Sequence, residues 1–141
     1  MWRGVAVAST TAVILVGCGD ERAHTTLAAQ QRSKPQFRLA LRAPTHTPRV
    51  GPKWWYVVRA SDRNGAPLRA RLTVEVVDPL GVAHPAEVGT SKRKLIDYPF
   101  IGRYRDFARW PPAARGYRLV FRVTVAARGA RRTVRYWVRP R

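Results

Sequence analysis

Alternation of apolar and polar residues dominates the chain from residue 36 onward. In the stretch LRARLTVEVVD, residues 68–78, apolar side chains occupy every second position and mostly polar or charged ones lie between them. Successive side chains of a strand point to opposite faces of a sheet, so this pattern predicts a strand with one buried face. The inward-facing residues expected here are Leu68, Ala70, Leu72, Val74 and Val76.

Other stretches repeat this alternation. They are residues 36–42, 53–61, 116–127 and 132–139, with 100–110 as a weaker candidate whose faces are mixed. Their expected inward-facing residues are Phe37, Leu39, Leu41, Trp54, Tyr56, Val58, Ala60, Tyr117, Leu119, Phe121, Val123, Val125, Val134, Tyr136 and Val138. Asn64-Gly65 and Gly129 supply turn residues between neighbouring strands.

Residues 82–99 are the least regular part of this region, and they predict a long loop with at most a short strand near Leu95. No segment longer than about ten residues has the 3.6-residue period of an amphipathic helix. We therefore predict that residues 36–141 form a single all-β domain.

The predicted strands indicate a more specific architecture. About seven short strands with turns every eight to twelve residues are typical of an immunoglobulin-like antiparallel β-sandwich. The stretch VVRASDRNGAPLRARLTVEV resembles the signature of bacterial Ig-like modules in cell-envelope proteins, in which a valine-rich strand ends in Asp-x-x-Gly-x-Pro. The matching residues are Asp62, Gly65, Pro67, Leu68, Ala70 and Leu72. This resemblance implies a fold and assigns no activity.

The N-terminal residues have a different composition. Met1-Trp2-Arg3 carries a positive charge, and the apolar run at 4–16 is shorter than the ~20 residues that a membrane-spanning helix needs. The run closes with Leu15-Val16-Gly17-Cys18, which resembles the bacterial lipobox. The resemblance implies that residues 1–17 are a signal peptide and that the Cys18 sulfur carries a diacylglycerol. A cleaved ordinary signal peptide and an uncleaved anchor are the alternatives.

Cys18 is the only cysteine in the chain, so its predicted role is a membrane anchor and not a disulfide. Two or three acyl chains would hold the protein stably at a bilayer. Residues 18–35 are polar and aperiodic, which predicts a flexible tether, with a short helix over 24–31 as the alternative. The predicted location is the outer face of the cytoplasmic membrane, where a nucleic-acid partner is not expected.

Basic residues far outnumber acidic ones, with 27 Lys and Arg against 8 Asp and Glu. Most are arginines, whose planar guanidinium favours bidentate contacts with carboxylate or phosphate. Six arginines and two tryptophans are predicted to face outward: Arg69, Arg71, Arg118, Arg122, Arg135, Arg139, Trp55 and Trp137. Alternate strand residues lie ~6.6–7 Å apart, close to the phosphate spacing of a polymer, and the tryptophans could stack on sugars.

Two interpretations of this basic surface remain open. In the first, it docks a protein or an anionic envelope polymer such as phospholipid headgroups, a teichoic-type polymer or an acidic glycan. In the second, the arginines are solvated strand faces that reflect the codon bias of a GC-rich genome.

Metal-binding and catalytic patterns are sparse. The histidines are His24, His46 and His84, and no two have the spacing of a strand or helix pair. We therefore predict no metal site and no cofactor. An accessory role in envelope copper or redox traffic is the alternative function, because some envelope Ig-like domains are copper-linked.

Asp97 and Asp106 flank an aromatic stretch and are the candidates for a catalytic carboxylate pair. Pairing with the neighbouring Arg103 and Arg105 at the surface is their more ordinary role. No nucleophile elbow and no glycine-rich phosphate loop is present. The chain is therefore not expected to be an enzyme.

Overall fold

The computed structural model describes residues 36–141, which form an all-β body, so the all-β part of the predicted fold class is confirmed. The predicted signal peptide at 1–17, the lipidated Cys18 and the tether at 18–35 lie outside the described residues. The strands are β1 (Arg38–Arg42), β2 (Lys53–Ser61), β3 (Arg69–Val77), β4 (Ala83–Pro85), β5 (Glu87–Val88), β6 (Arg93–Lys94), β7 (Tyr98–Ile101), β8 (Arg103–Arg109), β9 (Leu119–Ala127) and β10 (Ala130–Val138). A 3₁₀ turn, η1 (Pro112–Ala114), precedes β9.

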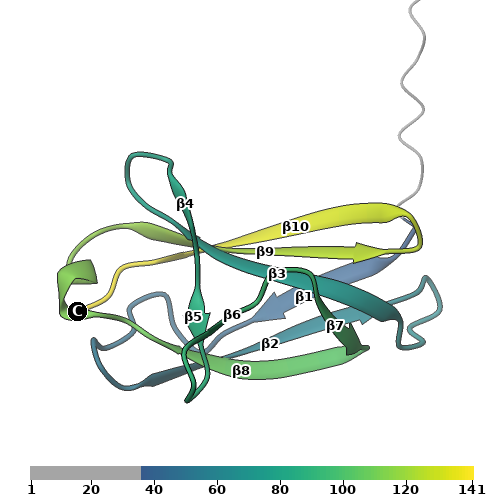
Figure 1. Ribbon diagram of the computed structural model, residues 1–141, viewed down its shortest axis with the longest axis horizontal. Coiled ribbons are helices and arrows are strands. Elements are labelled where there is room, and N and C mark those ends of the chain that lie inside the picture. Colours follow the sequence, from purple (N-terminus) through teal and green to yellow (C-terminus); the bar gives the residue numbers. More distant parts are fainter. Residues whose placement is uncertain (1–35) are drawn as a thin grey trace, which may run out of the picture. The chain divides into compact units, whose positions relative to one another are not determined.

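Two antiparallel sheets face each other in a sandwich-like arrangement (Figure 1). One sheet has the order β1-β2-β8-β5-β6, and the other has the order β10-β9-β3-β4 with β7 also paired to β3. β4 and β5 belong to different sheets, and the single residue Ala86 separates them. This short segment therefore passes directly from one sheet to the other.

Aromatic side chains fill the space between the two sheets. The Trp54 ring meets Phe121 edge-on at 5.1 Å and Trp110 at 5.5 Å between ring centroids. Tyr56 meets Phe121 in the same way at 4.9 Å. Such pairs contribute about 0.5–1.5 kcal/mol each beyond the burial of their surface. The Trp54 indole N–H donates to the Thr45 carbonyl, so this ring also fixes the loop after β1.

The predicted strand faces are confirmed except at one residue. The inward positions of β2, β3 and β9 are buried or nearly so, and those of β1 and β10 are buried or half-buried. Tyr117, which we expected to face inward, has 58% of its surface exposed. It lies before β9 in the turn after η1, where its N–H donates to the Ala114 carbonyl. The two-residue alternation therefore does not extend to Tyr117.

The irregular region 82–99 contains more structure than predicted. It supplies β4, β5, β6 and the start of β7, which is why the described residues have ten strands and not about seven. Leu95 follows β6, is buried, and accepts a hydrogen bond from the Val74 N–H. Strands of two or three residues are too short for an alternation to be visible, so the sequence could not reveal them.

The chain enters the sandwich at Gln36, beside Asn64 in the β2–β3 turn and Arg128 in the β9–β10 turn. The corner between β7 and β8 lies at the same end, because Gly102 accepts from the Ala60 N–H and donates to the Leu68 carbonyl. We call this the N-proximal end. The C-terminus and η1 lie at the opposite end of the sandwich (Figure 1).

Candidate functional site

Strand register places most of the predicted arginines on one surface, the outer face of β3, β9 and β10. Arg71 lies opposite Ala126, and Ala126 lies opposite Arg131. Glu75, Arg122 and Arg135 form a parallel row four residues further along. Arg69 begins β3 on the same face. We call this surface the arginine face.

Two of these arginines already have acidic partners. Arg122 directs Nε and an Nη at the same Glu75 oxygen, each at 2.9 Å, and both side chains are half-buried. Arg71 pairs with Asp97 at 2.9 Å, but this pair is well exposed and contributes less than about 1 kcal/mol. Arg69 and Arg135 have no side-chain partner among the described residues.

A hollow of about 380 Å³ lies at the middle of the arginine face. Its walls are Glu75, Arg122, Thr124, Thr133 and Arg135. The two threonine hydroxyls hydrogen-bond each other across β9 and β10 at 3.0 Å. One cation, Arg135, is therefore left uncompensated beside two hydroxyls, a combination that suits an anionic oxygen.

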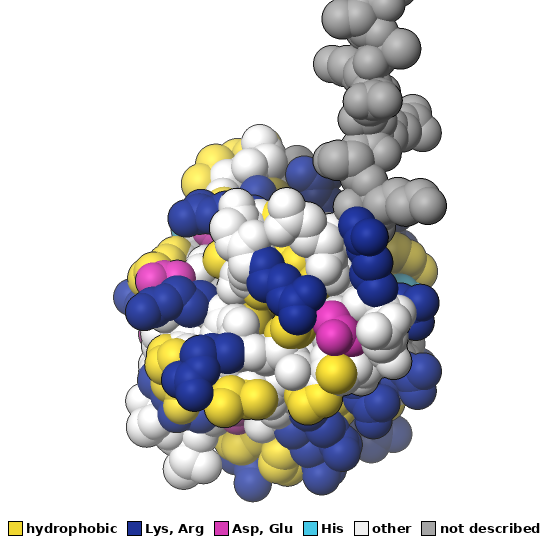
Figure 2. Space-filling model, turned by 90° about the vertical axis from the view of Figure 1, so that its right-hand side faces the viewer, with side chains coloured by type: hydrophobic (Ala, Val, Ile, Leu, Met, Phe, Trp, Pro, Cys, Tyr) yellow, Lys and Arg dark blue, Asp and Glu magenta, His cyan; other side chains and the backbone are white. Residues whose placement is uncertain are grey.

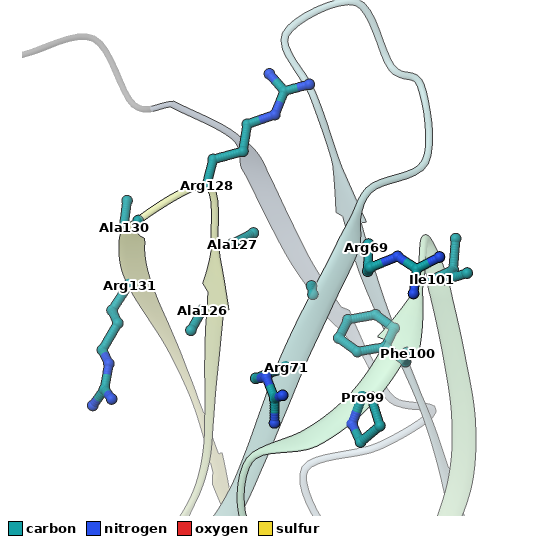
Figure 3. Close-up of a pocket in the computed structure, with 12 residues that line it drawn as sticks. Arg69, Arg71, Pro99, Phe100, Ile101, Ala126, Ala127, Arg128, Ala130 and Arg131 are labelled. Carbon is teal, nitrogen blue, oxygen red and sulfur yellow. The ribbon is translucent and has the colours of Figure 1, made fainter.

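A second hollow, of about 670 Å³, lies toward the N-proximal end of the same face (Figure 3). Its floor contains alanines of β9 and β10 together with Phe100, and its rim carries Arg69, Arg71, Arg128 and Arg131. The hollow opens where the pairing of β3 with β9 stops at Arg71 and Ala126. It therefore combines an apolar floor with a cationic rim.

Trp137 lies further along the arginine face, with Arg118 beside it. The Arg118 guanidinium lies 5.4 Å from the centroid of the Trp137 ring, and the His46 ring is stacked on Trp137 at 4.2 Å. His46 is also stacked on Tyr136 at 4.0 Å, and its Nδ1 lies 2.6 Å from the Trp137 carbonyl oxygen. Groups of the protein itself therefore cover part of the Trp137 ring, and the residue keeps 41% of its surface exposed.

Trp55 does not lie with the other candidates, because β2 belongs to the other sheet. The eight predicted residues therefore form no single surface. The Trp55 ring meets Phe107 edge-on at 5.1 Å, and the Arg105 guanidinium lies 4.7 Å from its centroid. Lys53 lies 4.8 Å from the Phe107 centroid. These residues form a separate cation–aromatic cluster on the outer face of β2 and β8.

Asp106 and Asp97 have different roles from those predicted. Asp106 is 7% exposed on the inner face of β8, where it accepts hydrogen bonds from Tyr104 at 2.6 Å and Arg93 at 3.2 Å. Neither aspartate pairs with Arg103 or Arg105, and the two carboxylates are held by different arginines. Burial, followed by the hydrogen bond to Asp106, raises the pKa of Tyr104 above its ordinary value.

Histidines of the described region also have partners within the protein. His84 Nε2 lies 3.2 Å from the Asp78 carboxylate, and hydrogen bonds from Val82 and His84 lower the pKa of Asp78. Within residues 36–141, no three His, Cys, Asp or Glu side chains gather as a metal site requires. His24 lies outside these residues. The described part of the chain also has no helix of the length and apolarity needed to cross a bilayer.

Sequence reasoning missed Arg131 and Arg128, which line the larger hollow. We expected the last strand to begin at residue 132, whereas β10 begins at Ala130. Arg131 has the same parity as Arg135, so extending the alternation by one residue would have found it. Arg128 lies in the turn and adopts a positive φ of 51°, which alternation does not predict.

Comparisons with known proteins assign no family. No family model matches the chain, and no curated protein matches it. Among solved structures, it is similar to the crystal structure of a DUF4466 family protein from Parabacteroides merdae ATCC 43184, with 14% sequence identity and a TM-score of 0.40. The match covers 74% of this chain and 44% of that chain, so it spans less than half the length of that protein.

Proposed function

We propose that this protein is an exported, lipid-anchored module of the cell envelope that docks an anionic partner through the arginine face. Cys18 is the proposed anchor, and an immunoglobulin-like sandwich is the proposed body. The proposal makes binding, and not catalysis, the role of the domain.

One observation carries the docking part of this proposal. Arg135 has no side-chain partner among the described residues and lies in a hollow beside two threonine hydroxyls. Glu75 is the single acidic residue on β3, β9 and β10, and Arg122 already neutralises it. An anion at this hollow would therefore meet cationic and hydroxyl donors with little competing negative charge.

The docking proposal is tested by titrating the protein with poly(glycerol phosphate) at several salt concentrations. Binding should weaken with salt, because each phosphate contact releases a condensed counterion. The double variant R118Q/R135Q should reduce both the affinity and the salt slope. The control R42Q/R59Q removes the same charge from exposed positions on the other sheet and should change neither. Binding that ignores salt, or equal losses in both variants, would contradict the proposal.

The anchor is tested separately on the full chain. Mass spectrometry of protein purified from membranes should find a chain that starts at Cys18 and carries acyl groups. The variant C18S should leave the membrane fraction. A protein that keeps an unmodified Cys18 thiol would overturn the anchor without affecting the polymer-binding result.

A further inference from the structure

The N-proximal end of the sandwich carries arginines from three separate turns. They are Arg63 of the β2–β3 turn, Arg69 and Arg103 beside the β7–β8 corner, and Arg128 of the β9–β10 turn with Arg131 just after it on β10. Figure 2 shows this end of the molecule, with dark-blue Lys and Arg side chains around its circumference and few acidic side chains among them. Three turns that are far apart in the sequence thus form one basic surface.

Little negative charge opposes these arginines. Asp62 is the acidic residue in these turns, and its carboxylate already accepts the N–H groups of Asn64 and Ala66 at 2.9 and 2.8 Å. Its second oxygen lies 3.9 Å from Arg128. The side chains of Arg69, Arg103 and Arg131 have no partner among the described residues. These three cations are therefore uncompensated among the described residues.

An apolar residue projects from the same end. Ile101 pairs with Arg69 across β7 and β3 and is 60% exposed. It lines the 670 Å³ hollow, whose floor is apolar and whose rim is cationic (Figure 3). Cations around exposed apolar groups match the interface of an anionic bilayer, in which phosphates lie above the hydrocarbon.

We propose that the N-proximal end is a membrane-docking surface that binds the phosphate headgroups of an anionic phospholipid bilayer. This inference rests on the proposed anchor, which places the bilayer near Gln36. Only 17 residues separate Cys18 from Gln36, and a random coil of this length spans about 20–25 Å. A nine-residue strand is about 30 Å long, so the far end of the sandwich lies further from Gln36 than this average span.

The experiment uses the full chain incorporated in vesicles and measures backbone hydrogen exchange. Vesicles that contain phosphatidylglycerol are compared with vesicles of phosphatidylcholine alone. Amides of residues 62–66, 101–103 and 127–131 should exchange more slowly in the anionic vesicles, and raised salt should abolish the difference.

Charge-matched variants locate the surface. Each arginine near an anionic bilayer changes the docked population about fivefold, so R69Q/R103Q/R131Q should reduce it on the order of 100-fold and remove the protection. The control R49Q/R115Q/R141Q removes three exposed arginines near the far end and should keep the protection. Equal exchange in both kinds of vesicle, or protection lost equally in both variants, would overturn the inference.

Failure of this inference can be distinguished from failure of the proposed function. The exchange measurement compares two lipids and does not depend on how the chain is held in the membrane. A chain that is not recovered from membranes contradicts the anchor at Cys18, and adding that chain to both kinds of vesicle still tests the docking surface. Polymer binding in solution tests Arg118 and Arg135, which are not varied in the exchange experiment.

Discussion

The hydroxyl of Tyr104 donates a 2.6 Å hydrogen bond to the carboxylate of Asp106 on the inner face of β8. Arg93, which begins β6, donates to both groups, at 3.0 Å to the Tyr104 oxygen and 3.2 Å to Asp106. The contact ties the short strand β6 to the longer β8. A buried carboxylate therefore holds the least regular part of the domain in place.

The substitution D106N should destabilise the domain by about 1–3 kcal/mol. The change removes the negative charge that Arg93 faces. It also places an amide N–H₂ group, which can only donate, next to the Arg93 guanidinium and the Tyr104 hydroxyl, which both donate to Asp106. Chemical denaturation measures the loss. D97N is the matched control, because the exposed pair of Asp97 with Arg71 should contribute less than about 1 kcal/mol. Equal losses in the two variants would contradict this role of Asp106.

Tyr56 and Tyr104 should respond oppositely to removal of their hydroxyls. The Tyr56 hydroxyl is buried with no hydrogen-bond partner among the described residues, so Y56F should be neutral or stabilising by up to about 1 kcal/mol. Y104F removes two hydrogen bonds and should cost about 1–2 kcal/mol. The denaturation midpoints of the two variants are compared with that of the unsubstituted protein. A Y56F variant that is less stable than the unsubstituted protein would contradict this prediction.

Stability should fall in alkaline solution. Burial is the main cause that raises the pKa of Tyr56 and of Tyr104 above the ordinary tyrosine value of about 10. The folded state holds these two phenol protons more tightly than the unfolded chain does. Their contribution to the free energy of unfolding is therefore complete below pH ~10 and is lost as the pH rises above that value. Above pH ~10, each of the two tyrosines lowers the free energy of unfolding by about 1.4 kcal/mol per pH unit.

Denaturation between pH 8 and pH 11 measures how the free energy of unfolding falls with pH. Y56F should make this fall shallower, because only Tyr104 then contributes to it. An unchanged slope in Y56F would show that this phenol ionises normally in the folded domain.

The β7–β8 corner should accept only glycine at position 102. Gly102 has a φ of 62°, and a Cβ there would lie 2.5 Å from the Pro67 Cβ. G102A should therefore destabilise the domain by about 2 kcal/mol or more, because both strain and overlap oppose it. G65A is the control, since Gly65 has a φ of 92° but nothing within 4 Å, and it should cost about 1 kcal/mol. Thermal unfolding of both variants tests this order.

Local patterns predicted the long strands and failed where distant residues decide the structure. The faces of β2, β3 and β9 follow from a period of two, which each strand displays within its own nine residues. The burial of Asp106 depends on Arg93, whose position on β6 no local pattern reveals. Likewise, parity made Trp55 an outward residue, but only sheet order shows that it lies away from Arg69.

The arginine face was predicted in part for the same reason. Alternation identified outward arginines strand by strand, and the register of β3, β9 and β10 then determines which of them are neighbours. The acidic partners Glu75 and Asp97 become visible only when strands are paired. The sequence therefore predicted which arginines lie on the surface. It did not predict which of them are neutralised by acidic partners.

The direct passage from β4 to β5 through Ala86 has a consequence for unfolding. A linker of one residue is too short to let the two sheets separate. Neither sheet can therefore unfold while the other keeps its hydrogen bonds. Loss of secondary structure and loss of tryptophan packing should then coincide in a single cooperative transition.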